Sequence, residues 1–350
     1  MKKLIISALL SWSLAGWYAT AANRVAFDAE AVLPSTEQPV DVSFQAVTWR
    51  HDTLIASGMG GGIFASSDNG ISWRQLPAPP DSDTLQFRDN QLLNNDRLVL
   101  MSAGEGVSSG VFISDDFGLS WRRVATGNSE TTFYDCFYML DEQQGWLYGD
   151  ADEQGLFVLH TGDGALSWQR MALPLAAQPG EGGFASSGTC LNSLSAEPGV
   201  IIGTGNGANS RLIVNRQGQW RAIESPISGG EAGGIFSVQS TPDTIYVSGG
   251  SLKHAEHPAQ MWRYAVSQQR WHALPQLPMK GAVYGSALLS TASGLSIWVS
   301  NPQGVWYLPA EANSWQQVSR SNIWSLACKD RVGCVGVGKN GTIERYLPKA

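Results

Sequence analysis

The sequence predicts an all-β fold, a seven-bladed β-propeller of four-stranded antiparallel blades. Three observations predict it: a tryptophan that recurs every 44–52 residues, a turn motif ahead of the first three of these tryptophans, and 39 glycines in 350 residues. A period near fifty residues is typical of one propeller blade with four short strands. Frequent glycine is typical of the many tight turns that join such strands.

The turn motif occurs at residues 66–73 (SSDNGISW), 114–121 (SDDFGLSW) and, degraded, 161–168 (TGDGALSW), where Ala165 replaces the glycine. This is the Asp-box (BNR-type) pattern Ser/Thr-x-Asp-x-Gly-x-x-Trp. Its Asp and Ser side chains can bond backbone amides within a tight turn, glycine takes the positive φ, and the tryptophan starts the next strand. These residues satisfy their own turn, so we predict a structural role for Asp68, Gly70, Trp73, Asp116, Gly118, Trp121, Asp163 and Trp168. The tryptophan rhythm continues without the motif at Trp220, Trp271 and Trp315.

The number of blades follows from this spacing. The first blade is expected to have strands at residues 44–49, 53–57, 62–66 and 72–76. Six blades that end on a tryptophan leave a C-terminal segment with only three expected strands, 323–328, 334–338 and 342–346. The apolar stretch 25–33 can supply the fourth strand and close the ring, which removes sheet edges that would otherwise be exposed.

The N-terminus predicts export. Lys2 and Lys3 precede a short apolar run, and residues 19–21 (ATA) offer a cleavage site. The run is shorter than the roughly 20 residues of a membrane span. We expect a signal peptide at 1–21, the propeller at 22–350, no stable membrane span, and a periplasmic or secreted location. Loss of the two lysines leaves 21 basic against 30 acidic residues, which argues against nucleic acid as a partner.

The four cysteines can form disulfides in an oxidising compartment. Cys328 and Cys334 flank an expected hairpin and are the candidate bridge. Cys136 and Cys190 occupy equivalent segments of neighbouring repeats, and both a bridge and two buried thiols remain open.

Several segments resemble one branch of the BNR propellers, the photosystem II stability and assembly factors (the Ycf48/HCF136 type) and their bacterial relatives. The segments are 87–89 (FRD), 133–136 (FYDC), 149–150 (GD), 180–191 (GEGGFASSGTCL), 203–207 (GTGNG), 232–237 (AGGIFS) and 284–287 (YGSA). The resemblance spans nearly the whole mature chain. It implies a propeller that holds another polypeptide and assists its assembly or stability.

Inner strands line a propeller's channel, and ligand sites usually lie at its mouth. The predicted partner- or ligand-binding residues are Arg88, Asp135, Asp150, Glu181, Ser187, Ser237, Tyr284 and Trp324.

Two functions remain open. The leading hypothesis is a non-catalytic exported propeller that binds a protein in the cell envelope. The alternative is a glycoside hydrolase-like enzyme that acts on carbohydrate with Asp135 and Glu181 as its carboxylates. Tyr284 could be a nucleophile of the sialidase kind, but only Arg88 is available to clamp the substrate's carboxylate. For both carboxylates, capping of inner-strand turns is the competing interpretation.

The sequence predicts no metal site and no cofactor. The five histidines are scattered, and the one close pair, His254-Ala-Glu-His257, falls in a loop rather than on the helix that its spacing would suit. The glycine-rich residues 58–62 lack the Lys-Ser/Thr of a phosphate-binding loop.

Overall fold

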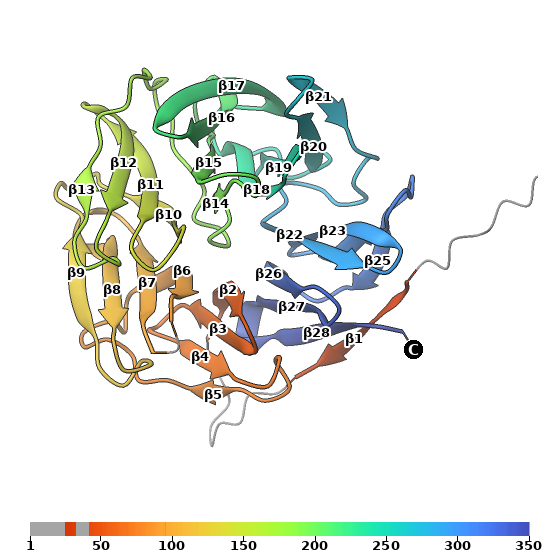
Figure 1. The fold of residues 1–350 in the computed structure, drawn as a ribbon, viewed down its shortest axis with the longest axis horizontal. Helices are drawn as coiled ribbons and strands as arrows, with labels where there is room; N and C mark the ends of the chain where they lie inside the picture. Colours follow the sequence, from red (N-terminus) through yellow and green to blue (C-terminus); the bar gives the residue numbers. More distant parts are fainter. Residues whose placement is uncertain (1–24, 33–41, 95, 350) are drawn as a thin grey trace, which may run out of the picture.

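The computed structural model describes residues 25–32, 42–94 and 96–349, and the predicted signal peptide lies outside them. The described residues form seven four-stranded antiparallel blades around a central channel (Figure 1), which confirms the predicted fold class. No helix among them is long and apolar enough to cross a membrane.

Each blade runs from an inner strand at the channel to an outer strand at the rim. Two short 3-10 helices, η1 (Gly106–Ser108) and η2 (Lys339–Gly341), lie in connections. The strands are, in blade 1, β2 (Phe44–Arg50), β3 (Thr53–Gly58), β4 (Ile63–Ser66) and β5 (Arg74–Gln75); in blade 2, β6 (Gln86–Leu92), β7 (Leu98–Ala103), β8 (Gly110–Ser114) and β9 (Arg122–Thr126); in blade 3, β10 (Tyr134–Met139), β11 (Gly145–Asp152), β12 (Gly155–Thr161) and β13 (Gln169–Arg170); in blade 4, β14 (Leu191–Ser193), β15 (Gly199–Gly203), β16 (Asn209–Arg216) and β17 (Gln219–Ser228); in blade 5, β18 (Gly233–Thr241), β19 (Thr244–Ser251), β20 (Gln260–Ala265) and β21 (Arg270–Ala273); in blade 6, β22 (Gly285–Thr291), β23 (Gly294–Asn301), β24 (Gly304–Leu308) and β25 (Gln316–Ser319); and in blade 7, β26 (Ile323–Lys329), β27 (Gly333–Gly338), β28 (Ile343–Pro348) and β1 (Phe27–Ala31).

The N-terminal strand closes the ring, as predicted. β1 pairs antiparallel with β28, with Phe27 opposite Pro348. The Phe27 ring makes edge contacts with Trp298 and Tyr307 of blade 6, with ring centroids 4.7 and 5.0 Å apart. The closing strand therefore packs against its neighbouring blade as well as completing its own.

Three of the six recurring tryptophans donate a hydrogen bond to the preceding blade. The indole N–H of Trp121 donates to the Pro77 carbonyl of the preceding blade (2.9 Å), and that of Trp315 does the same to Pro275 (2.9 Å). Trp271 repeats this contact with Glu224 at 2.8 Å. Trp271 and Trp315 make this contact although their blades lack the turn motif, whereas Trp73 donates to the Gly70 carbonyl within its own turn.

The three motif turns share one hydrogen-bond pattern. Asp116 accepts bonds from the Ser120 hydroxyl (2.6 Å), the Ser120 backbone N–H (2.8 Å) and the Ser114 hydroxyl (2.7 Å). These bonds, with the Ser120 hydroxyl contributing most, lower the pKa of Asp116 to about 2. Asp68 and Asp163 make the equivalent bonds.

Candidate functional site

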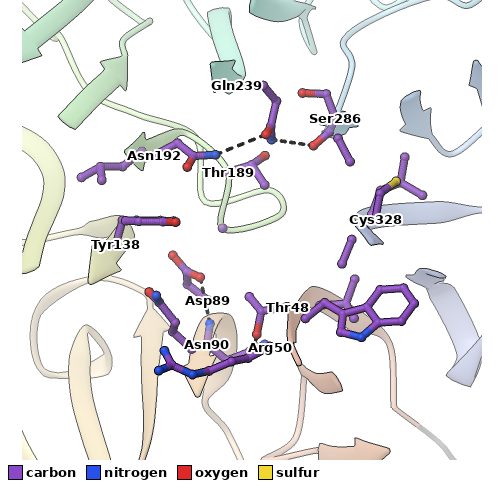
Figure 2. A pocket seen from close by; sticks show the side chains of 18 of the residues that line it. Thr48, Arg50, Asp89, Asn90, Tyr138, Thr189, Asn192, Gln239, Ser286 and Cys328 are labelled. Atoms are coloured by element: carbon purple, nitrogen blue, oxygen red, sulfur yellow. Dashed lines mark hydrogen bonds between the residues drawn. The ribbon is translucent and has the colours of Figure 1, made fainter. Parts of the chain in front are cut away.

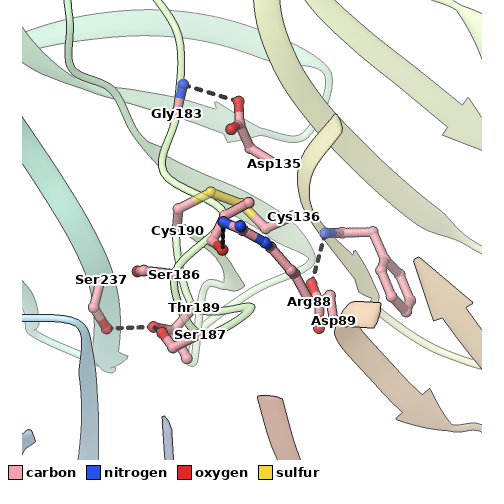
Figure 3. The surroundings of a disulfide bond; sticks show 12 residues. Arg88, Asp89, Asp135, Cys136, Gly183, Ser186, Ser187, Thr189, Cys190 and Ser237 are labelled. Atoms are coloured by element: carbon pink, nitrogen blue, oxygen red, sulfur yellow. Dashed lines mark hydrogen bonds between the residues drawn. A yellow bond between two sulfur atoms is a disulfide. The ribbon is translucent and has the colours of Figure 1, made fainter. Parts of the chain in front are cut away.

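A loop that precedes β14 enters the central channel (Figures 1 and 3). We call residues 182–188 the channel loop. Arg88 of blade 2 donates to a loop carbonyl at 3.0 Å. The Ser187 hydroxyl donates to the Tyr284 carbonyl before blade 6 (2.7 Å), and the Ser325 hydroxyl of blade 7 donates to the Ser187 carbonyl (3.1 Å). The loop therefore spans the channel from one side to the other.

Three carboxyl groups press against glycines of the channel loop. Gly183 N–H donates to Asp135 Oδ2 at 2.9 Å, and a Cβ at Gly183 would lie only 2.7 Å from that oxygen. A Cβ at Gly182 would overlap the Asp150 carboxylate, and one at Gly188 would overlap that of Asp89. Only glycine allows the backbone this close, because any side chain would displace the carboxyls.

The disulfide between Cys136 and Cys190 fixes the far end of the channel loop (Figure 3). The sequence left this pair open between a bridge and two thiols, and the structure has the bridge. Cys328 and Cys334 form the second disulfide, across the β26–β27 hairpin. The first bridge ties the loop to the inner strand of blade 3, so the loop is held covalently as well as by hydrogen bonds.

Burial makes the two neighbouring acids Asp135 and Asp150 hard to ionise. Desolvation raises the pKa of Asp150 to about 6, although a hydrogen bond from Gly183 opposes the shift. Desolvation and then the charge of Asp150 raise the pKa of Asp135 well above its usual range. Arg88 lies near enough to offset part of this rise.

Asp150 should make the stability of the fold depend on pH. Its folded-state pKa of about 6 lies above the unfolded value near 4, so ionisation costs more in the folded state. The cost is absent below about pH 4, grows through pH 6 and is complete above it, so this group lowers stability as pH rises. We expect Asp150→Asn to raise the free energy of unfolding at pH 7 by on the order of 2 kcal/mol, with little gain at pH 4. Urea unfolding across this range measures it, and an equal change at both pH values would contradict the assignment.

Glu181 is fully buried and forms an internal ion pair. Its carboxylate accepts Nε of Arg211 (2.9 Å) and also pairs with Nη2 of the same guanidinium. The Thr204 hydroxyl and the Gln178 backbone N–H complete the set, each at 2.8 Å. Four donors occupy the four acceptor positions of a carboxylate. Glu181 therefore holds the start of the channel loop, and the structure gives no observation that favours the glycosidase role predicted for it with Asp135.

The other predicted residues fall into two groups. Some support the channel loop, and the others lie at the mouth of the channel where the inner strands begin. Ser187 and Ser237 are buried, and Ser237 accepts a hydrogen bond from Thr189 (2.7 Å). Tyr284 and Trp324 are half-buried where their inner strands begin, and their ring centroids lie 6.4 Å apart. Arg88 and Asp150 are also half-buried. The structure thus gathers these residues around one loop, and their binding role stays a prediction.

The opposite mouth of the channel contains a pocket that sequence reasoning missed. Its volume is about 430 Å³, and residues of all seven inner strands line it. Gly188, the last residue of the channel loop, and the adjoining Thr189 contribute to the pocket wall. In Figure 2 the Tyr138 side chain points toward the centre, with Asn192 and Gln239 on one side and Arg50 on the other.

The pocket wall is a belt of hydrogen bonds between blades. The Thr48 hydroxyl donates to Asn90 Oδ1 (2.7 Å), and Gln91 exchanges two bonds with the Met139 backbone (2.9 and 3.0 Å). Gln239 Nε2 donates to the Ser286 carbonyl at 2.7 Å. These bonds tie neighbouring inner strands to one another around the pocket. Polar residues of the inner strands contribute to this wall, but the sequence alone does not mark which of them line the pocket.

Three larger side chains stand among the pocket residues and are not fully buried: Trp49, Arg50 and Tyr138. The Arg50 side chain is 37% exposed and pairs with Glu142 at 2.6 Å. Its charge is therefore already balanced within the chain.

Comparisons with solved structures agree on the fold. The chain is similar to a structure described as YCF48 bound to D1 peptide, with a TM-score of 0.63 and 12% identity over 92% of this chain and 97% of that one. It is also similar to YCF48 from Cyanidioschyzon merolae (TM-score 0.63, 10% identity, 91% and 99% covered) and to the WD40 β-propeller domain of Doa1 (TM-score 0.63, 10% identity, 93% and 98% covered). No family model and no curated protein sequence matches the chain.

Proposed function

We propose that this chain is a non-catalytic propeller that binds a segment of another protein at the pocket-bearing mouth of its channel. The observation that carries the proposal is the pocket of about 430 Å³, whose lining includes Trp49, Arg50 and Tyr138. Tryptophan, tyrosine and arginine are enriched among the few residues that supply most of the binding energy at protein interfaces. A wall that is already ordered loses little entropy when a partner binds.

The pocket's size and charge narrow the kind of partner. A volume of about 430 Å³ accepts a few side chains of an inserted segment, not a folded domain. Arg50 is paired with Glu142, and the whole chain carries a net charge of −7. Both features favour a neutral or basic segment over an acidic one, because an acidic partner would meet like charge.

The biological role of this binding is a further part of the proposal. Resemblance to the BNR propellers of the photosystem II assembly-factor branch supports a role in the assembly or stability of the bound protein. A solved propeller of the same fold, described as bound to a D1 peptide, supports a polypeptide as the ligand class. Two disulfides and the signal-like residues 1–21 support export to the cell envelope.

The test first captures a partner protein. It then compares how tightly this partner binds to variants with a substitution at one or the other mouth of the channel. Tyr138→Ala and Arg50→Ala should each weaken binding to the captured protein by about 30-fold, which equals about 2 kcal/mol. Trp324→Ala changes the opposite mouth, where the sequence placed the binding residues, and binds like wild type if the pocket is the binding site. Calorimetry with the purified partner measures the affinities. Equal affinities for wild type, Tyr138→Ala and Arg50→Ala would overturn the assignment of the pocket.

A further inference from the structure

The loop between β19 and β20 gathers three side chains that can bind a metal ion. His254, Glu256 and His257 each offer one ligand atom, and these atoms all lie within 4.8 Å of one another. Glu256 Oε1 is 3.3 Å from His257 Nε2 and 3.8 Å from His254 Nδ1. Ligand atoms around a tetrahedral ion with bonds of 2.0–2.1 Å lie about 3.3 Å apart. Small side-chain rotations therefore suffice to close the set around an ion.

We propose that this loop is a binding site for a divalent first-row transition metal of the Zn²⁺ class. Two imidazoles and one carboxylate suit Zn²⁺, Ni²⁺ or Cu²⁺, whereas Ca²⁺ and Mg²⁺ prefer oxygen ligands alone. Three protein ligands leave a fourth tetrahedral position open to solvent or to an outside donor. The site lies on the face where the inner strands begin, away from the proposed partner pocket, so it does not depend on the proposed function.

The backbone of the loop is fixed, so the ligand set is partly preorganised. His254 N–H donates to the Ser251 hydroxyl (3.1 Å), and His257 N–H donates to the His254 carbonyl (3.0 Å). Gly281 N–H, from a neighbouring connection, donates to the His257 carbonyl at 2.8 Å. The turn places both imidazoles on one side without a helix, which is why the three-residue spacing was misleading in the sequence.

Charges of both signs lie around the loop, and Lys280 is on the neighbouring connection, where it pairs with Pro258. The one lysine in the turn, Lys253, forms an ion pair with Glu231. Glu231 also lies close enough to His254 for their charges to interact. The side chains of His254, Glu256 and His257 are 58%, 66% and 68% exposed, so an ion reaches them without any opening of the fold.

The test is calorimetric titration of Zn²⁺ into the untagged mature protein after dialysis against a chelator. We expect one ion per chain, with His254→Ala and His257→Ala each weakening the affinity by at least about 10-fold and Glu256→Gln weakening it in the same direction. His51→Ala, which removes an exposed histidine elsewhere, is the matched control and should bind like wild type. All four cysteines are in disulfides, so no thiolate competes.

The proposal fails if wild type shows no saturable Zn²⁺ binding. It also fails if the His254→Ala and His257→Ala proteins bind as tightly as His51→Ala. All three histidines are exposed, so we expect the variants to fold, and thermal unfolding of the metal-free proteins checks this.

Discussion

Replacing Glu181 with alanine is expected to lower the free energy of unfolding by about 3–5 kcal/mol, because it leaves the Arg211 guanidinium buried without its partner. The Arg211 side chain is only 14% exposed and cannot regain full hydration by a small movement. The change also releases the Thr204 hydroxyl and the Gln178 N–H from their acceptor. Chemical denaturation of the purified variant measures the loss.

The matched control is Glu231→Ala, which removes the acid of the exposed Lys253 ion pair. That change should cost far less than Glu181→Ala, since both side chains stay in water. An Arg211→Leu change in the Glu181→Ala background should cost less than the two single changes added together, because it removes the stranded charge. A loss below 1 kcal/mol for Glu181→Ala would show that the internal ion pair does not hold the channel loop.

Gly188→Ala is expected to cost about 3–5 kcal/mol. Gly188 has a φ of +72°, and a Cβ there would lie 2.7 Å from Asp89 Cγ. The buried Asp89 carboxylate accepts the backbone N–H groups of Asn90 and Phe137, both at 2.8 Å, and would have to leave them. The cost therefore combines backbone strain with the loss of two buried hydrogen bonds.

Gly218→Ala separates these two contributions. Gly218 has a φ of +82° but no atom within 4 Å of its built Cβ, so alanine there should cost only the left-handed strain of about 1–2 kcal/mol. Thermal unfolding of the Gly188→Ala and Gly218→Ala proteins measures how much more stability the first variant loses. Equal losses would mean that the channel loop can move off Asp89 freely.

The architecture was predictable because its signals are local and repeated. The turn motifs and the tryptophan spacing follow from hydrogen bonds within a few residues or to the adjacent blade, as at Asp116 and Trp121. The closing strand was predictable by elimination, since the last repeat lacked one strand. These features require no knowledge of how distant segments meet.

The interior of the channel was not predictable, because its structure depends on contacts between residues that are far apart in the sequence. The channel loop has no counterpart in the other repeats, and its path depends on contacts with distant blades, such as those of Arg88 and Ser325. Glu181 looked like a free channel carboxylate because its partner Arg211 lies 30 residues away on β16. The pocket residues, such as Asn90 and Gln239, looked like ordinary strand positions because nothing in the sequence marks which inner-strand residues stay uncovered.

The most direct test of the central claim is site-specific photo-crosslinking in the cells of the native host. A photoreactive residue replaces Tyr138 at the pocket in one protein and Trp324 at the opposite mouth in another, and mass spectrometry identifies the products. We predict one protein partner crosslinked from position 138, through one short segment, and far less from position 324. No specific product from position 138, or the same products from both positions, would contradict the account.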